Sequence, residues 1–196
     1  MINQSSYIIN QDGEALYYGS ILSQEQNESY FDELLNSIQW VNEVVIMFGK
    51  TITTKREVAF YGNDAIEYTY SNQKKRALPW TPLLMDIKKT VEACTGESYN
   101  ACLMNLYHDG SEGMGWHADN EKEIKADSSI ASVSIGAVRN FSFKHRVSGE
   151  KHSLLLENGS LLEMRGPIQR YWLHSLPKSA KVKEARINLT FRQMLK

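Results

Sequence analysis

The chain has 196 residues, 42% of them hydrophobic and 23% charged, and a formal net charge of −1. This length suits one well-buried domain better than two, and the ordinary composition excludes a disordered or low-complexity protein. The longest apolar runs are too short to cross a bilayer, so we expect no membrane partner.

The cysteines and the first residues bear on the compartment. Cys94 and Cys102 are the only cysteines in the sequence, and they stand in no metal-like spacing. The first residues have neither a basic start nor an apolar run, unlike a signal peptide. We therefore expect reduced thiols and a monomeric protein of the cytoplasm, or of the nucleus in a eukaryote.

The charges are distributed unevenly along the chain. Residues 1–44 contain seven acidic and no basic side chains, whereas residues 45–90 contain eight basic and four acidic ones. Two interpretations remain open for the basic segment. It forms either a solvated lysine surface, which the charges alone favour, or a surface that faces phosphates.

The N-terminal elements are predicted to be a hairpin followed by a helix. Residues 7–9 and 16–18 are apolar and aromatic runs on either side of an Asp-Gly turn, which is a hairpin signal. Ser23 and Gln26 then have the spacing of a capping box, so we expect a helix to begin just after Ser23.

Two strands and a second helix follow. Residues 44–48 and 57–61 are typical of strands, and we expect the polar stretch 49–56 to connect them. Thr81 is a suitable N-cap, and Pro82 is suited to the first helical position. A helix is therefore predicted to begin at Pro82.

From about residue 99 the apolar pattern has a period of two. Short runs of this kind, separated by turn residues, indicate an antiparallel sandwich or a jelly-roll barrel. The predicted strands are residues 99–107, 129–137, 139–145, 151–157, 160–165, 169–176 and 185–193. We predict one domain over residues 1–196, mainly β with flanking helices (α+β), in which residues 1–98 form an N-terminal extension and residues 99–196 the jelly-roll core.

Three residues are candidate metal ligands. His117 and Asp119 lie two positions apart in GWHADNE, and side chains two apart on a strand point to the same face. The pair alone is weak evidence, and His174 in RYWLHSLP is the natural third ligand. Two histidines and one carboxylate with open positions are typical of non-haem Fe(II) oxygenases, although zinc could use the same ligands hydrolytically.

The segment RINLTFR, residues 186–192, predicts an anion site. Its polar residues alternate with apolar ones and are Arg186, Asn188, Thr190 and Arg192. If the polar face looks into the barrel, its two guanidinium groups require anionic partners, and a small dicarboxylate would satisfy both. The alternative is an edge strand whose polar face meets water.

These motifs together resemble a known family. NLYHDGSEGMGWHADNE, RYWLHSLP and RINLTFRQ are similar to the AlkB family of Fe(II)- and 2-oxoglutarate-dependent nucleic-acid dealkylases, over about residues 44–193. The likeness is closest to the branch that repairs alkylated bases in duplex DNA, and MFGK, YGND and YTYS resemble its nucleotide-recognition segments. The resemblance implies a double-stranded β-helix (jelly-roll, cupin-like) core with a nucleotide-recognition hairpin region.

The resemblance also implies a chemistry and a set of site residues. In this family O₂ is activated, 2-oxoglutarate is cleaved to succinate and CO₂, and an N-methyl carbon is oxidised and lost as formaldehyde. The implied Fe(II) ligands are His117, Asp119 and His174. The implied 2-oxoglutarate residues are Arg186 with Tyr107 at the far carboxylate, Arg192 at the metal end, and Asn105, Asn188 and Thr190 around them.

The resemblance places the methylated base above the metal. Tyr68, Tyr70 and Ser71 would form one wall, the ring of His117 the other, and Glu121 would lie near the base edge. A cationic base such as 1-methyladenine or 3-methylcytosine would be favoured beside a carboxylate and aromatic faces. The alternative for YTYS is an ordinary amphipathic strand.

A hairpin tip is the candidate contact with the rest of the nucleic acid. By resemblance, Met47, Phe48 and Gly49 would enter the gap that a flipped base leaves, and Lys50 and Arg56 would lie beside phosphates or the gap. The alternative for Phe48 is ordinary packing in the core.

Two departures from the family leave the substrate open. Asn120 stands where duplex-acting relatives carry Asp, and the hairpin at residues 147–150 is short. Alkylated DNA, single- or double-stranded, is the expected partner, and RNA is a second possibility. Three further functions are compatible with the sequence: a dioxygenase of the same fold that acts on RNA or protein, a zinc hydrolase, and a non-catalytic cupin-like binding module.

Overall fold

The computed structural model describes residues 5–47, 50–64, 66–70 and 73–195. Its helices are α1 (Gln24–Ser37), α2 (Pro82–Thr95) and α3 (Ile168–Tyr171). Its strands in the first half of the chain are β1 (Ser6–Ile9), β2 (Glu14–Ser20), β3 (Val41–Met47), β4 (Lys50–Gly62), β5 (Glu67–Tyr70), β6 (Gln73–Arg76) and β7 (Leu78–Pro79). The strands that follow are β8 (Ala101–Tyr107), β9 (Met114–His117), β10 (Ile130–Gly136), β11 (Arg139–His145), β12 (Lys151–Leu156), β13 (Ser160–Arg165), β14 (Trp172–Leu176) and β15 (Arg186–Arg192).

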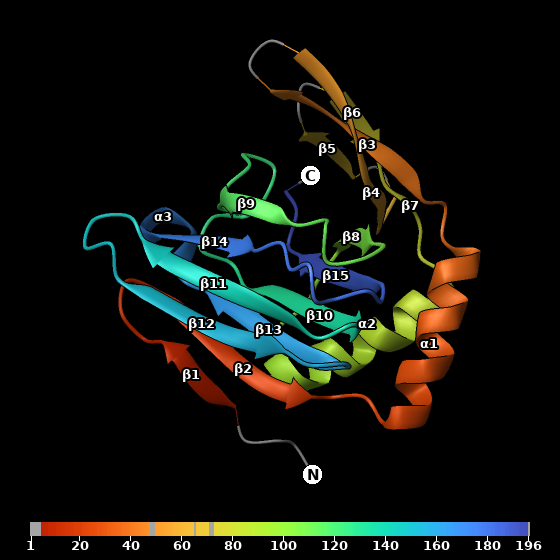
Figure 1. Cartoon of the computed structure of the whole chain (residues 1–196). Helices are drawn as coiled ribbons and strands as arrows, with labels where there is room; N and C mark the ends of the chain where they lie inside the picture. The colour runs from red at the N-terminus through yellow and green to blue at the C-terminus, as the bar shows by residue number, and fades with distance from the viewer. Residues whose placement is uncertain (1–4, 48–49, 65, 71–72, 196) are drawn as a thin grey trace.

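Two sheets form the core of the molecule (Figure 1). The larger has the order β1-β2-β13-β10-β15-β8-β4-β3, with β7 added to β4, and the smaller has the order β12-β11-β14-β9. From β8 onward the chain passes repeatedly from one sheet to the other, and every pairing among β8–β15 is antiparallel. This connectivity is that of a jelly roll, so the predicted fold class is confirmed.

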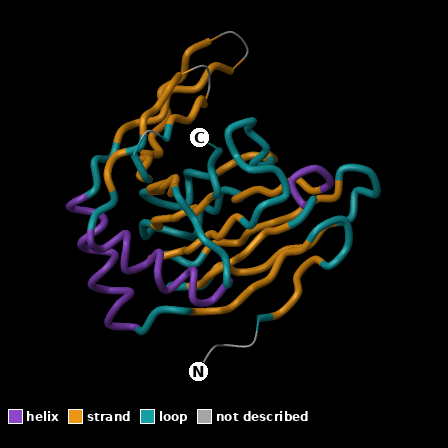
Figure 2. The backbone as a smooth tube through the Cα atoms, turned by 180° about the vertical axis from the view of Figure 1, so that it is seen from behind, coloured by secondary structure: helices purple, strands orange, loops and turns teal. Residues whose placement is uncertain are grey.

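The helices α1 and α2 cover the outer face of the larger sheet, as Figure 2 shows from behind. Leu34 of α1 and Leu84 of α2 share one core cluster with Leu189 of β15. Both helices begin where the sequence predicts, because Ser23 forms a capping box with Gln26 and the Thr81 side chain accepts from an amide of the first turn. A second core cluster fills the space between the two sheets.

Two hairpins, β3–β4 and β5–β6, rise from one end of this core (Figure 1). The prediction that residues 49–56 connect two strands is wrong for residues 50–56, which form the first half of β4. There the backbone pairs with β3 from Met47↔Lys50 onward, so its amides are satisfied as a ladder rather than by water. Phe48 and Gly49 at the predicted tip lie outside the described residues.

One predicted strand is partly helical. Residues 169–171 belong to α3, and the strand starts only at Trp172. The physical cause is the preceding turn, in which Gly166 has φ +65 and the Arg170 amide donates to the Pro167 carbonyl at 2.9 Å. Such a turn leads into one helical turn, and the extended strand begins only after it.

Two further expectations can be compared with the structure. Cys94 and Cys102 are free cysteines, as expected. Among the described residues, no helix has the length and apolar character needed to span a membrane.

Candidate active site

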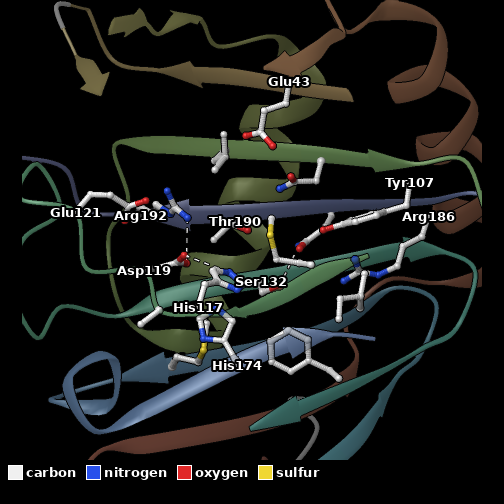
Figure 3. Close-up of a pocket in the computed structure, with 18 residues that line it drawn as sticks. Glu43, Tyr107, His117, Asp119, Glu121, Ser132, His174, Arg186, Thr190 and Arg192 are labelled. Atoms are coloured by element: carbon white, nitrogen blue, oxygen red, sulfur yellow. Dashed lines mark hydrogen bonds and ion pairs between the residues drawn. The ribbon is translucent and has the colours of Figure 1, made fainter. Parts of the chain in front are cut away.

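A cavity of about 120 Å³ opens between the two sheets (Figure 3). Its lining combines polar and charged groups with a few apolar side chains. The lining residues are Glu43, Leu103, Asn105, Tyr107, Met114, His117, Ala118, Asp119, Glu121, Ser132, Phe141, Met164, His174, Leu176, Arg186, Asn188, Thr190 and Arg192.

His117 and His174 face each other across two paired strands. His117 ends β9, and the register of β9 with β14 places its Cα opposite that of His174. The ring centroids are 4.2 Å apart, and Phe141 stacks on His174 at 5.5 Å. Burial, together with the neighbouring His117, lowers the pKa of His174 to about 3, so its imidazole is neutral, as a metal ligand requires.

Asp119 completes the group, although not from a strand. The prediction that it shares a strand face with His117 is wrong, because β9 ends at His117 and the chain then turns away from β14. The Asp119 amide donates to Gln169 Oε1 at 3.0 Å, and Arg192 Nη2 lies 3.0 Å from Asp119 Oδ2. These two contacts turn the carboxylate inward, where Oδ1 is 3.9 Å from His117 Nε2.

The charge of Asp119 is set by opposing effects. Burial alone would raise its pKa, but Arg192 and the two histidines outweigh burial and hold the pKa below its ordinary value. The group therefore offers an ionised oxygen and two ring nitrogens, and one such atom from each residue lies within 4.8 Å of the others. This donor set fits Fe(II) or a similar divalent metal.

Arg186 forms the second chemical feature of the cavity. Its side chain is 1% exposed, and it donates from Nη2 to Ser134 Oγ at 2.8 Å. Its Nε has no hydrogen-bond partner, and no carboxylate pairs with it, among the described residues. Burial is the main cause that lowers its pKa to about 10; Tyr107 opposes this shift and nearby Arg139 adds to it. A buried cation with spare donors fits an anionic ligand.

The polar face of β15 looks into the cavity, as predicted. Its apolar residues are fully buried in the core below the helices. β15 lies between β10 and β8 in the larger sheet, so the alternative of a wet edge strand is wrong. The register places Arg186 opposite Tyr107 and Asn188 opposite Asn105 on β8, so the residues named by resemblance lie side by side.

Several residues in or beside the cavity were not predicted from the sequence. Ser132 and Ser134 of β10 lie beside β15, and Asn188 Nδ2 donates to Ser132 Oγ at 2.9 Å. Their signal was present, since small polar residues alternate with apolar ones in IASVSIG. Gln169 and Glu43, by contrast, reach the site from distant elements and have no local signal.

The Tyr107 end of the cavity is strongly cationic. The guanidinium carbons of Arg56, Arg139 and Arg186 lie 5.9, 5.9 and 5.5 Å from the Tyr107 ring centroid. Arg139 is 2% exposed and donates to the carbonyls of Glu112 at 2.8 Å and Pro177 at 2.9 Å. Two buried cations thus meet here with backbone or hydroxyl partners, and a dicarboxylate would supply the missing negative charge.

The residues predicted to contact nucleic acid are only partly described. Tyr68 and Tyr70 lie on β5, whose backbone pairs with β6, whereas Ser71 lies outside the described residues. Glu121 lines the cavity on the side of Arg192 (Figure 3).

Arg56 is a correction to the sequence-based prediction. It was expected beside phosphates or the gap left by a flipped base, but it is 6% exposed and forms an ion pair with Glu43. The cause is alternation along β4, which directs Lys55 to solvent and Arg56 to the interior. The backbone of Met47 and Lys50 closes the hairpin.

Comparison with known proteins gives consistent similarities. Residues 14–192 match the family model described as the 2OG-Fe(II) oxygenase superfamily. The chain is 37% identical to the DNA oxidative demethylase ALKBH2 of Bos taurus, covering 91% of this chain and 68% of the relative. It is 36% identical to ALKBH2 of Homo sapiens, covering 95% and 76%, respectively. The solved structure of OsALKBH1 superposes with a TM-score of 0.66 at 16% identity, over 97% of this chain and 100% of that one.

Proposed function

Because this chain belongs to the 2OG-Fe(II) oxygenase superfamily and, within it, to the AlkB family, we propose that it demethylates alkylated bases in DNA by oxidation. One observation carries the proposal. The His117–Asp119–His174 group and the buried cation Arg186 open into the same cavity, so a metal and a dicarboxylate can be held side by side.

The proposed metal ligands are His117, Asp119 and His174. Arg192 pairs with the Asp119 carboxylate, and Gln169 accepts from the Asp119 backbone amide. Three protein ligands leave coordination positions for 2-oxoglutarate and O₂. When bound together, Fe(II), 2-oxoglutarate and O₂ supply the oxidation of the N-methyl carbon, with release of succinate and CO₂.

The proposed cosubstrate pocket uses the polar faces of β8 and β15. Arg186 and Tyr107 would hold the far carboxylate, and Arg192 the carboxylate at the metal end. Charge-assisted contacts from fixed guanidinium groups orient such a ligand in one direction. The remaining polar wall is Asn105, Asn188 and Thr190.

The proposed substrate is a cationic N-methylated base, such as 1-methyladenine or 3-methylcytosine. Such a base must leave the stack to reach the metal. Tyr68, Tyr70 and Ser71 would cover one face, and Glu121 would lie near its edge. The product hydroxymethyl group then leaves as formaldehyde.

The proposed DNA-contacting segment is the β3–β4 tip. Met47, Phe48 and Gly49 would enter the gap left by the base, and Lys50 would lie beside a phosphate. DNA is the proposed partner in single- or double-stranded form.

We propose a single domain over residues 1–196 that acts as a monomer. β2 pairs with β13 and β4 with β8, which joins residues 1–98 to the core in one sheet. We propose the cytoplasm, or the nucleus in a eukaryote, as the compartment because the substrate lies there.

A turnover assay tests the function. The protein is incubated with Fe(II), 2-oxoglutarate and oligonucleotides that carry 1-methyladenine or 3-methylcytosine, and succinate and repaired base are measured by mass spectrometry. We expect equal amounts of both products. Turnover of methylated RNA alone would favour a dioxygenase that acts on RNA. Metal and 2-oxoglutarate binding without succinate formation would favour a binding module.

A further inference from the structure

Glu43, which lines the cavity, forms a buried ion pair with Arg56. Glu43 comes from β3 and Arg56 from β4, and the two residues are 5% and 6% exposed. Glu43 points toward the cavity from β3 (Figure 3). The pair belongs to the hairpin that rises from the core, yet it lies at the end of the hairpin that faces the site rather than at the tip.

Stability alone is a weak reason for this pair. Removing two charges from water costs free energy that their attraction seldom exceeds, and apolar residues of similar size often serve as well. A buried ion pair with one partner in the wall of a functional cavity therefore calls for a second role, which its other contacts indicate.

Arg56 contacts two separate walls of the site. Its Nη1 lies 3.2 Å from the sulfur of Met114, and its guanidinium carbon is 5.9 Å from the ring centroid of Tyr107. Met114 begins β9, the strand that ends in His117. Tyr107 is the cross-strand neighbour of Arg186. Arg56 thus touches the strand of one metal-ligand candidate and the proposed cosubstrate wall at once.

We propose that Arg56, held by Glu43, is a positioning residue for 2-oxoglutarate. It fixes the Tyr107 ring and the start of β9 so that the cavity keeps the shape that the dicarboxylate needs. A planar guanidinium can serve a carboxylate, a sulfur and a ring face together, which a lysine ammonium cannot. The inference rests on the proposed function, since it assumes that 2-oxoglutarate binds here.

Binding measurements separate this role from a phosphate contact. Arg56→Met is loaded with Mn(II) without O₂, and its dissociation constant for 2-oxoglutarate is measured by calorimetry. We expect a loss of roughly 3- to 30-fold, the range for a desolvated cation–π contact. Affinity for a methylated oligonucleotide, measured by fluorescence anisotropy from low to high salt, should keep both its value and its salt slope.

Lys55→Met is the matched control. Lys55 precedes Arg56 on β4 but is exposed. We expect unchanged 2-oxoglutarate affinity in this variant, whatever its effect on oligonucleotide binding. An Arg56→Met protein with normal 2-oxoglutarate affinity, or with weaker and less salt-dependent oligonucleotide binding, would overturn the proposal. Wild-type protein that binds no 2-oxoglutarate would overturn the proposed function itself.

A double variant guards against a simple folding defect. Arg56→Met leaves Glu43 as an unpaired buried charge, so its melting temperature is expected to fall. Glu43→Gln/Arg56→Met removes both charges and should recover the melting temperature while the loss of 2-oxoglutarate affinity remains. Recovery of both would show a merely structural pair and would contradict the positioning role.

Discussion

The charged side chains in the cavity differ in whether a group of opposite charge lies beside them. Asp119 is flanked by Arg192 and two histidines. Arg186 contacts the Ser134 hydroxyl and the Tyr107 ring but pairs with no carboxylate among the described residues. The group around Asp119 can therefore hold a metal ion, whereas the site around Arg186 needs an anionic ligand. Substitutions at the two positions should therefore fail in different ways.

Asp119→Asn should abolish turnover without unfolding the protein. The amide keeps an oxygen for Arg192 but removes the negative charge that a divalent metal needs. We expect no succinate formation and no rise in melting temperature on addition of Mn(II). Asn120→Ala, at the exposed neighbouring position, should keep both. Iron-dependent turnover in Asp119→Asn would contradict the ligand assignment.

Arg186→Ala should weaken 2-oxoglutarate binding while metal binding persists. Hydrogen bonds to charged groups contribute about 1.5–3 kcal/mol, which corresponds to roughly 10- to 150-fold in affinity. The measurement is the dissociation constant for 2-oxoglutarate in Mn(II)-loaded protein. Ser134→Ala removes only the hydroxyl partner of Arg186 and should have a smaller effect. An unchanged constant in Arg186→Ala would mean that the dicarboxylate binds elsewhere.

The sequence shows which residues alternate along one strand, but it does not show which distant residues contact each other in the fold. The polar face of residues 186–192 was predictable because alternation on a strand fixes the side-chain direction. The partner of the Asp119 amide is Gln169, 50 positions away, and the Met114 contact of Arg56 spans 58 positions. No local pattern encodes such pairs, and the expectation that Arg56 lies beside phosphates or the gap rested on the family resemblance alone.

Among the helices and strands, those whose first residues carry capping motifs were predicted best. The helices α1 and α2 start directly after their N-caps, Ser23 and Thr81, as predicted. The short helix α3 was missed because four residues carry too little periodicity to be distinguished from the strand that follows. The end of β9 was missed because it depends on pairing with β14, which the sequence does not display.

The joint between β2 and β13 contains a buried polar network that should stabilise the fold. Tyr18 Oη donates to Glu163 Oε2 at 2.7 Å, and Glu163 is 0% exposed and also accepts from Ser129 at 2.7 Å. Tyr18→Phe leaves a buried acceptor with one partner fewer. We expect a loss of about 1–3 kcal/mol in the free energy of unfolding, measured by urea denaturation.

Tyr17→Phe is the adjacent control for this joint. Tyr17 Oη donates at 3.2 Å to Glu157, whose side chain is exposed, so water can replace the lost bond. We expect a loss below about 1 kcal/mol. Equal losses in the two variants would show that burial of Glu163 adds nothing to the stability of the joint.

At the scale of the whole molecule, two hairpins stand above the end of the core that holds the cavity (Figure 1). The basic residues of the 45–90 segment whose side chains the structure describes do not form one exposed surface. Arg56 is buried and Lys88 pairs with Glu92 at 2.7 Å, whereas Lys55, Arg76 and Lys89 are exposed. These exposed residues are among those through which added salt would weaken nucleic-acid binding by counterion release.

Phe48→Ala tests whether the β3–β4 hairpin opens a duplex. Phe48 lies outside the described residues, between Met47 and Lys50 in the sequence, and the backbones of these two residues pair. Unstacking and unpairing a base costs a few kcal/mol, and a single strand has largely met that cost already. We therefore expect Phe48→Ala to slow demethylation of a lesion in double-stranded DNA much more than in a single strand, with an unchanged melting temperature. Equal losses on both substrates would place Phe48 in the base pocket, or in the core if the melting temperature also falls. No loss on either substrate would contradict the insertion of Phe48 into the duplex. The substrate would then be single-stranded nucleic acid, which Asn120 and the short hairpin at residues 147–150 favour.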